Sequence, residues 1–123
     1  MNANETLIRQ FITAWSRLDA KELASYFTED GCYHNMPTQP VCGRENVEKL
    51  IAGFSSSWKS TEWEVLNLIS SGNLVMAERV DRAQTSQGDV ALPCVGVFEI
   101  EAGKIKVWRD YFDMATYANQ LKG

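Results

Sequence analysis

The second half of this sequence is a run of long strand patterns separated by short turns, and this limits the chain to folds built on an antiparallel sheet. Strands are expected over residues 61–70, 74–85, 90–100 and 104–112. The segments between them, 70–73, 86–89 and 101–103, each contain a glycine, and most of their other residues are small or polar. Such segments are typical of hairpin turns, so neighbouring strands should run antiparallel.

The first half has the spacing of amphipathic helices. Apolar residues at helical intervals predict helices over residues 4–17 and 43–54. Asp19, followed three residues later by Glu22, has the pattern of a capping box and predicts a second helix over residues 20–27. A short strand at 32–36, a loop at 37–40 and a closing helix at 113–121 complete the prediction. Helices followed by an antiparallel meander indicate an α+β fold.

Two of the predicted strands carry charged residues on faces that otherwise suit a core. The period of two places Arg79 and Asp81 on one face, with small apolar neighbours. In the last strand, Asp110 shares a face with Trp108 and Phe112. Because a buried charge is costly unless it is paired, these residues suggest a polar constellation, and a carboxyl between aromatic rings suits acid or base chemistry. The alternative is a structural salt bridge, the usual role of an Arg–Asp pair two positions apart.

Composition excludes several classes of function. The net charge of −4 and the pI near 5.0 argue against a nucleic-acid surface. No apolar run is long enough to span a bilayer, and no signal peptide is visible. The cysteines, Cys32, Cys42 and Cys94, have neither CxxC nor zinc spacing, so we expect free thiols in a reducing, cytoplasmic location. The single histidine, His34, argues against a His-rich metal site, although carboxylates alone could hold a hard cation.

Four motifs occur in order along the chain: Tyr-His-Asn-Met-Pro at 33–37, Glu-Arg-Val-Asp at 78–81, Gly-Val-Phe at 96–98 and Trp-Arg-Asp-Tyr-Phe-Asp at 108–113. Together they resemble the limonene-1,2-epoxide hydrolase family. The resemblance runs from the first helix to the end of the chain and implies one domain over residues 1–123. It implies the cone-like fold of nuclear transport factor 2, ketosteroid isomerase and SnoaL-like proteins, in which a curved, antiparallel or mixed sheet has the N-terminal helices across its concave face.

The resemblance also assigns roles. It implies that Tyr33 and Asn35 hold the attacking water, that Asp110 is the base, and that Arg79 and Asp81 supply an arginine bridge and an acid. Water would attack the epoxide directly, without a covalent enzyme intermediate, a metal or an organic cofactor. Opening an epoxide requires one ionised carboxylate to accept a proton from water and one protonated carboxyl to give a proton to the leaving oxygen.

The expected pocket wall is apolar. Leu92 and Phe112 share strand parity with Cys94 and Asp110, whereas Trp15, Trp58 and Trp63 are placed by alignment with the family; the role these tryptophans would otherwise have is core packing. The substrate would be a lipophilic epoxide, such as a cyclic terpene epoxide, and three tryptophans would favour smaller or flatter ones.

The sequence also allows two other functions. The first is an isomerase or cyclase of the ketosteroid isomerase or polyketide cyclase type, with one aspartate as a carbon-acid base. The second is a small-ligand-binding dimer module without catalysis. A homodimer is expected in any case, since sheets of this fold class often pair, and Val95, Val97 and Arg109 on the outer sheet face are consistent with it.

Overall fold

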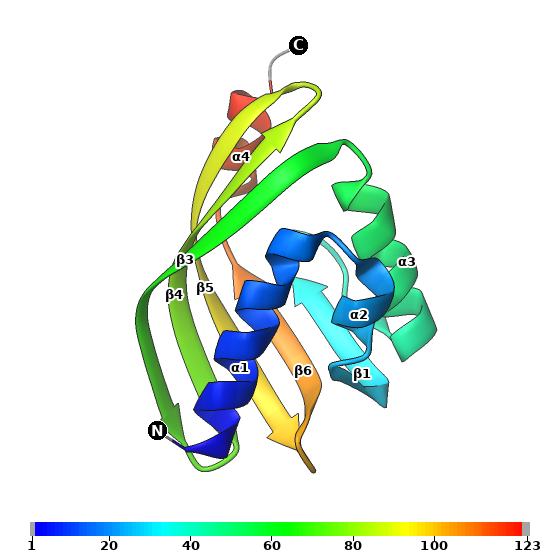
Figure 1. Ribbon diagram of the computed structural model, residues 1–123, viewed down its shortest axis with the longest axis vertical. Coiled ribbons are helices and arrows are strands. Elements are labelled where there is room, and N and C mark those ends of the chain that lie inside the picture. Colours follow the sequence, from blue (N-terminus) through cyan, green and yellow to red (C-terminus); the bar gives the residue numbers. More distant parts are fainter. Residues whose placement is uncertain (1, 122–123) are drawn as a thin grey trace.

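The computed structural model describes residues 2–121 and has four α-helices, one 3-10 helix and six strands in that range. Within these residues, no helix is long and apolar enough to cross a membrane. In chain order the elements are α1 (Ala3–Ala14), η1 (Trp15–Arg17), α2 (Ala20–Ala24), β1 (Phe27–Asn35), β2 (Val41–Cys42), α3 (Arg44–Ser55), β3 (Trp58–Ser71), β4 (Leu74–Thr85), β5 (Gly88–Glu101), β6 (Lys104–Tyr111) and α4 (Met114–Gln120) (Figure 1).

The strands form one curved sheet in the order β2-β1-β6-β5-β4-β3. Strands β3 to β6 pair antiparallel through consecutive hairpins, as the turn residues predict. Strand β1 instead runs parallel to β6, so the sheet is mixed. Helices α1, α2 and α3 lie across one face of the sheet, and α4 lies near one end of the long strands (Figure 1). The predicted α+β fold with helices over a curved sheet is confirmed.

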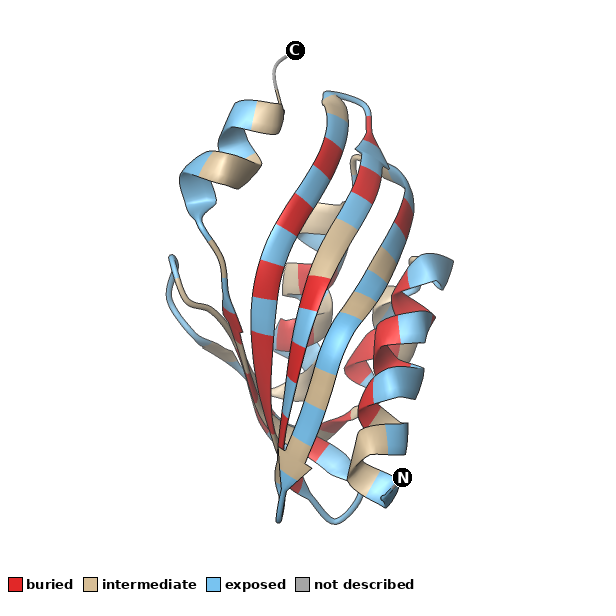
Figure 2. Ribbon diagram, turned by 90° about the vertical axis from the view of Figure 1, so that its left-hand side faces the viewer, coloured by how far each residue is buried: buried red, intermediate tan, exposed pale blue. Residues whose placement is uncertain are grey.

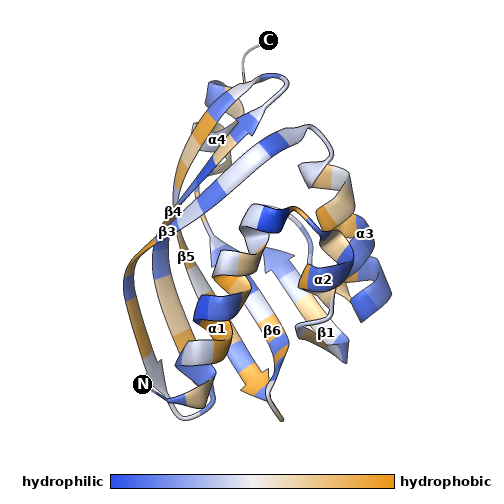
Figure 3. Cartoon of the chain, in the orientation of Figure 1, coloured by the Kyte–Doolittle hydropathy of each residue, from blue (hydrophilic) through white to orange (hydrophobic). Residues whose placement is uncertain are grey.

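Burial alternates along the long strands, and this alternation defines the inner face. Val75, Ala77 and Arg79 of β4 are buried, whereas Met76 and Glu78 between them are exposed (Figure 2). Polar and apolar residues also alternate around α1 and α3, as expected for helices that bury one side (Figure 3). The core lies between these helices and the inner face, where Phe11 meets the ring of Trp108 edge-on at 5.1 Å between centroids.

The segment after the second helix differs from the prediction. Asp19 caps α2 by accepting hydrogen bonds from the backbone of Lys21 and Glu22, but the helix ends at Ala24 and Phe27 already belongs to β1. Phe27 pairs with Ile105 of β6, and the register shifts before Cys32, so the predicted turn at 28–31 is an irregularity within the strand. The prediction failed here because pairing with β6, a distant segment, outweighs the local preference of the turn residues.

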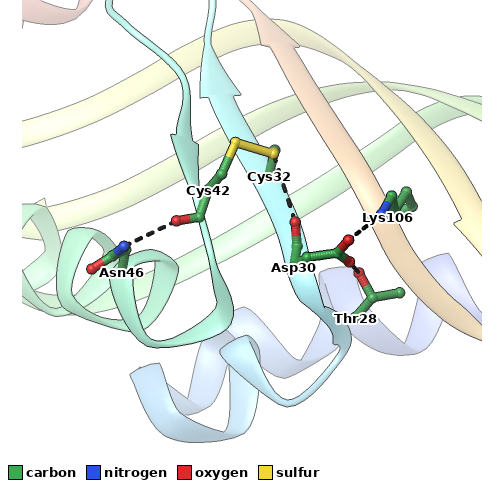
Figure 4. Close-up of a disulfide and its surroundings, with 6 residues drawn as sticks. All are labelled: Thr28, Asp30, Cys32, Cys42, Asn46 and Lys106. Carbon is green, nitrogen blue, oxygen red and sulfur yellow. Dashed lines mark hydrogen bonds and ion pairs between the residues drawn. A yellow bond between two sulfur atoms is a disulfide. The ribbon is translucent and has the colours of Figure 1, made fainter.

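The prediction of three free cysteines is wrong. Cys32 and Cys42 form a disulfide, and only Cys94 of the three is free (Figure 4). The two-residue strand β2, which the sequence pattern did not predict, places Cys42 directly opposite Cys32, with their Cα atoms 4.0 Å apart. A separation of ten positions gives no sign of this contact, because the contact depends on how the loop after β1 folds back. The expected cytoplasmic location rested on free thiols and loses that support.

Candidate active site

Arg79 joins two carboxylates at the centre of the inner face. It lies on β4 between the flanking strands β3 and β5, and its side chain is 0% exposed. Its Nε and Nη2 donate to the two carboxylate oxygens of Asp81 at 3.0 and 2.8 Å. Its Nη1 and Nη2 donate to those of Asp110 at 3.0 and 2.8 Å. The guanidinium therefore makes a bidentate contact with each carboxylate and fixes how far apart they lie.

Asp110 is also held from its own strand. The indole Nε1 of Trp108 donates to Oδ1 of Asp110 at 2.9 Å, two positions away on the same face of β6. Asp110 thus accepts three N–H groups, and these hold its carboxylate in a fixed orientation at the site. Gly96 of β5 leaves room for this geometry, because a Cβ atom at that position would lie 2.5 Å from Nη1 of Arg79 and 2.8 Å from Oδ1 of Asp110.

Strand β1 brings Tyr33 and Asn35 to the same place. In the parallel register Tyr33 lies beside Trp108 and Asn35 beside Asp110. The ring of Tyr33 stacks on that of Trp108 at 4.1 Å with an interplanar angle of 3°. The four motifs that are separate in the sequence therefore meet in one site, because β1, β6, β5 and β4 are consecutive neighbours in the sheet.

The site opens into a cavity of about 240 Å³. Tyr33, Asn35, Asp81 and Asp110 all line it, whereas Arg79 is not one of its lining residues and lies behind them. Most of the remaining wall is apolar or aromatic: Leu50, Phe54, Trp58, Trp63, Ala83, Val90, Leu92, Phe112, Met114 and Tyr117. A lipophilic ligand with one polar reacting group fits this distribution of polar and apolar surface.

Burial raises the pKa of two of these groups. It raises the pKa of Asp81, an effect that the Arg79 charge opposes and the nearby Asp110 charge reinforces. Burial also raises the pKa of the Tyr33 hydroxyl well above its usual value, again with help from Asp110. A raised carboxyl pKa is the property that a proton donor needs.

A metal ion is poorly accommodated at this cluster. Among the described residues, Asp81, Cys94 and Asp110 have potential ligand atoms within 4.8 Å of one another. The guanidinium of Arg79 already binds both carboxylates, so a cation would have to displace it. The charge that a metal would supply is supplied here by the arginine.

Four of the five expected wall residues, Trp58, Trp63, Leu92 and Phe112, line the cavity. Trp15 is 0% exposed and is not a lining residue; it lies against Trp63, with their rings stacked at 4.2 Å. The structure adds Met114 and Tyr117 of α4, which sequence reasoning missed. Their i, i+3 spacing is typical of a helix face. The side chain of Gln120 docks α4 on β5, because it accepts a hydrogen bond from the backbone N–H of Ala91 and donates one to the Ala91 carbonyl. Only this docking, together with the lining of the cavity, shows that Met114 and Tyr117 face it.

The family model of the limonene-1,2-epoxide hydrolase catalytic domain matches residues 2–122. The chain belongs to the limonene-1,2-epoxide hydrolase family. Epoxide hydrolase EphG of Mycobacterium tuberculosis is 25% identical to it over 107 residues, which are 87% of this chain and 71% of EphG.

Solved structures place this limonene-1,2-epoxide hydrolase family member within a broader fold. It superimposes on an M. tuberculosis epoxide hydrolase of the same type with a TM-score of 0.83 and 24% identity, covering 97% of this chain and 89% of that one. A Shewanella putrefaciens protein of the SnoaL-like polyketide cyclase type gives a TM-score of 0.88 and 16% identity, over 98% and 97% of the two chains. At these identities the superpositions show a shared fold, and this fold carries different activities.

Proposed function

We propose that this protein hydrolyses lipophilic epoxides to vicinal diols by general acid–base catalysis in one step. The observation that carries the proposal is the buried Arg79, which holds two carboxylates side by side at the polar end of an otherwise apolar cavity. Tyr33 and Asn35 line the same end of the cavity and can hold a water molecule next to Asp110. Membership of the limonene-1,2-epoxide hydrolase family supports this assignment.

Each residue has one task. Asp110 accepts a proton from water as the water oxygen attacks an epoxide carbon. The C–O bond of the epoxide breaks, and Asp81 gives its proton to the oxygen that leaves. Asp110 ends protonated and Asp81 ionised, so the proton must return to Asp81 before the next turnover. Arg79 stays charged and contacts both carboxylates throughout. Positioning of water against the epoxide carbon supplies much of the rate gain, since good orientation is worth roughly 7–11 kcal/mol.

The cavity supports a substrate that is apolar apart from the epoxide. Its volume of about 240 Å³ and its aromatic walls, including Phe54, Trp58 and Trp63, favour compact or flat epoxides over the bulkiest ones. A panel from small aryl epoxides to large terpene epoxides measures this preference. The highest kcat/KM on the largest members would contradict it.

The reaction itself is tested by single-turnover hydrolysis in isotopically labelled water, with wild type beside Asp110→Asn and Asp81→Asn. Label in the diol alone, with both folded variants inactive, supports direct attack by water. Label in the protein indicates an ester of an aspartate and overturns the one-step mechanism.

If folded wild type hydrolyses no epoxide, the proposed function is wrong, and isomerase, cyclase or ligand-binding function is favoured instead. An isomerase would exchange a carbon-bound proton of a ketone substrate with solvent. A binding module would keep its ligand affinity in Asp110→Asn.

We also propose that the protein is a homodimer that pairs through the outer sheet face. Met76, Val95 and Tyr111 are each between 37% and 45% exposed on that face, and Val95 and Tyr111 are register partners. Ile69 of β3, the register partner of Met76, extends the apolar surface at 65% exposure. Light scattering on the purified protein measures the mass directly, and Val95→Glu should shift it from dimer to monomer.

A further inference from the structure

Trp63 contacts the arginine that holds the two aspartates. In the β3–β4 register Trp63 lies opposite Asp81, and its ring reaches diagonally across to Arg79, whose Cζ is 4.7 Å from the ring centroid. Diagonal neighbours on one sheet face are within the reach of aromatic side chains. Trp63 is a wall of the cavity and Arg79 is not, so the indole ring lies at the boundary between the cavity and the buried guanidinium.

The orientation of the Trp63 ring is fixed from two sides. Its Nε1 donates to the hydroxyl of Thr61 at 3.0 Å, and that hydroxyl in turn donates to the carbonyl of Arg82 at 2.6 Å. The ring of Trp15 stacks on it at 4.2 Å with an interplanar angle of 17°. Trp15 is fully buried and so cannot easily move away. The surface that Trp63 presents to Arg79 is therefore rigid.

The rigid ring of Trp63 covers a part of the Arg79 guanidinium that the carboxylates do not contact. The guanidinium directs its N–H groups toward Asp81 and Asp110, and none of these bonds covers its flat faces. A desolvated cation is stabilised by the face of an aromatic ring, and tryptophan is the strongest partner for it. The ring also keeps water in the cavity from competing for the N–H groups that bind the carboxylates.

We propose that Trp63 is a positioning residue for the reaction: its ring holds the Arg79 guanidinium in the orientation that bridges Asp81 and Asp110, and it excludes water from that bridge. Its part in the reaction rests on the proposed hydrolase function. Its part in holding Arg79 does not. A residue that serves only as a wall would change substrate binding and leave the acid–base pair as it was.

The kinetic test compares Trp63→Leu with Trp58→Leu, since both remove a tryptophan from the cavity wall but Arg79 lies over the ring of Trp63 alone of the two. Trp63→Leu should lower kcat by roughly 10- to 100-fold, the cost of small displacements in a catalytic site. It should also move the alkaline limb of the kcat profile, because the pKa of Asp81 depends on its burial and on its contact with Arg79, and Trp63 maintains both. Trp58→Leu should raise KM and leave that limb in place. If the alkaline limb lies at the same pH in Trp63→Leu as in Trp58→Leu, the proposal is wrong.

Two further variants guard against a simple folding defect. Trp63→Phe keeps an aromatic face and should retain most of kcat. Thr61→Val keeps the volume but removes the acceptor for the indole N–H, and it should move the alkaline limb in the same direction as Trp63→Leu by a smaller amount. A Trp63→Phe protein as impaired as Trp63→Leu would show that the π face is not what matters.

A second readout needs no activity. In isotope-labelled protein, the Nε–H resonance of Arg79 should lose the ring-current contribution of Trp63 in Trp63→Leu and keep it in Trp58→Leu, while the contribution of Trp108, whose ring centroid is 5.8 Å from Cζ, stays in both. The carboxyl of Asp81 should titrate at a changed pH in Trp63→Leu alone. This result, with an inactive wild type, would refute the proposed hydrolase while supporting the role of Trp63. Unchanged resonances and titration, with an active wild type, would refute the role of Trp63 and leave the hydrolase intact.

Discussion

Breaking the Cys32–Cys42 disulfide should destabilise the protein by about 3 kcal/mol. The bridge joins residues ten positions apart. In the chain-entropy relation, closing a loop of this size removes about 9 cal/mol/K from the unfolded chain, which gives the figure of about 3 kcal/mol near room temperature. For a chain of 123 residues this loss corresponds to a fall in Tm of roughly 12 °C.

The effect should extend to the active site, because the closed loop contains three residues that line the cavity: Tyr33, Asn35 and Thr38. Strand β2 has two residues and pairs only with β1, at the edge of the sheet. Without the bridge it should detach more readily than any central strand. Activity should therefore decline at temperatures below those at which the whole protein unfolds.

The assay is urea unfolding of three samples: wild type, wild type with a dithiol reductant, and the Cys32→Ser, Cys42→Ser double variant. The reduced wild type and the double variant should unfold at the same, lower urea concentration, and the reductant should not affect the double variant. Cys94, which is buried, should stay unreactive in all native samples. Equal midpoints for oxidised and reduced wild type would refute the loop-closure reasoning, and two additional titratable thiols in the oxidised protein would refute the disulfide itself.

Three other changes probe the buried cluster. Gly96→Ala should destabilise the fold by about 1–3 kcal/mol and lower activity, because its Cβ would lie 2.5 Å from Arg79; thermal melts and kcat report both. Arg79→Met should cost about 3–5 kcal/mol, since it leaves two buried carboxyls without their cationic partner, and raising the pH should make that loss larger in urea titrations. Burial raises the pKa of Asp81 in the native protein above that in the unfolded chain. The protonation of Asp81 therefore adds to the free energy of unfolding in full below the ordinary carboxyl pKa, and this addition is lost as the pH rises through the native pKa. The urea midpoint of wild type should then fall with pH relative to that of Asp81→Asn, and parallel curves would count against the raised pKa.

Local periodicity determined much of this protein. The alternation along β4 predicts that Arg79 and Asp81 share the inner face, and the glycine-containing turns predict the antiparallel order of β3 to β6. The carboxyl group of Asp19 caps α2 as its position predicts, and that of Asp113 caps α4 at the start of the predicted closing helix. These features depend on residues within a few positions of each other, so a sequence pattern contains them.

Features that join distant segments needed the tertiary structure. The parallel pairing of β1 with β6, the disulfide between Cys32 and Cys42 and the contact of Trp63 with Arg79 each depend on strand register or loop path. Trp15 shows the same limit. Its helical position predicts burial, but only the tertiary structure shows that it stacks on Trp63 and that Trp63, not Trp15, lines the cavity. The sequence by itself therefore determined which face each residue occupies. Only the fold decided which faces meet, because that choice depends on packing between segments far apart in the chain.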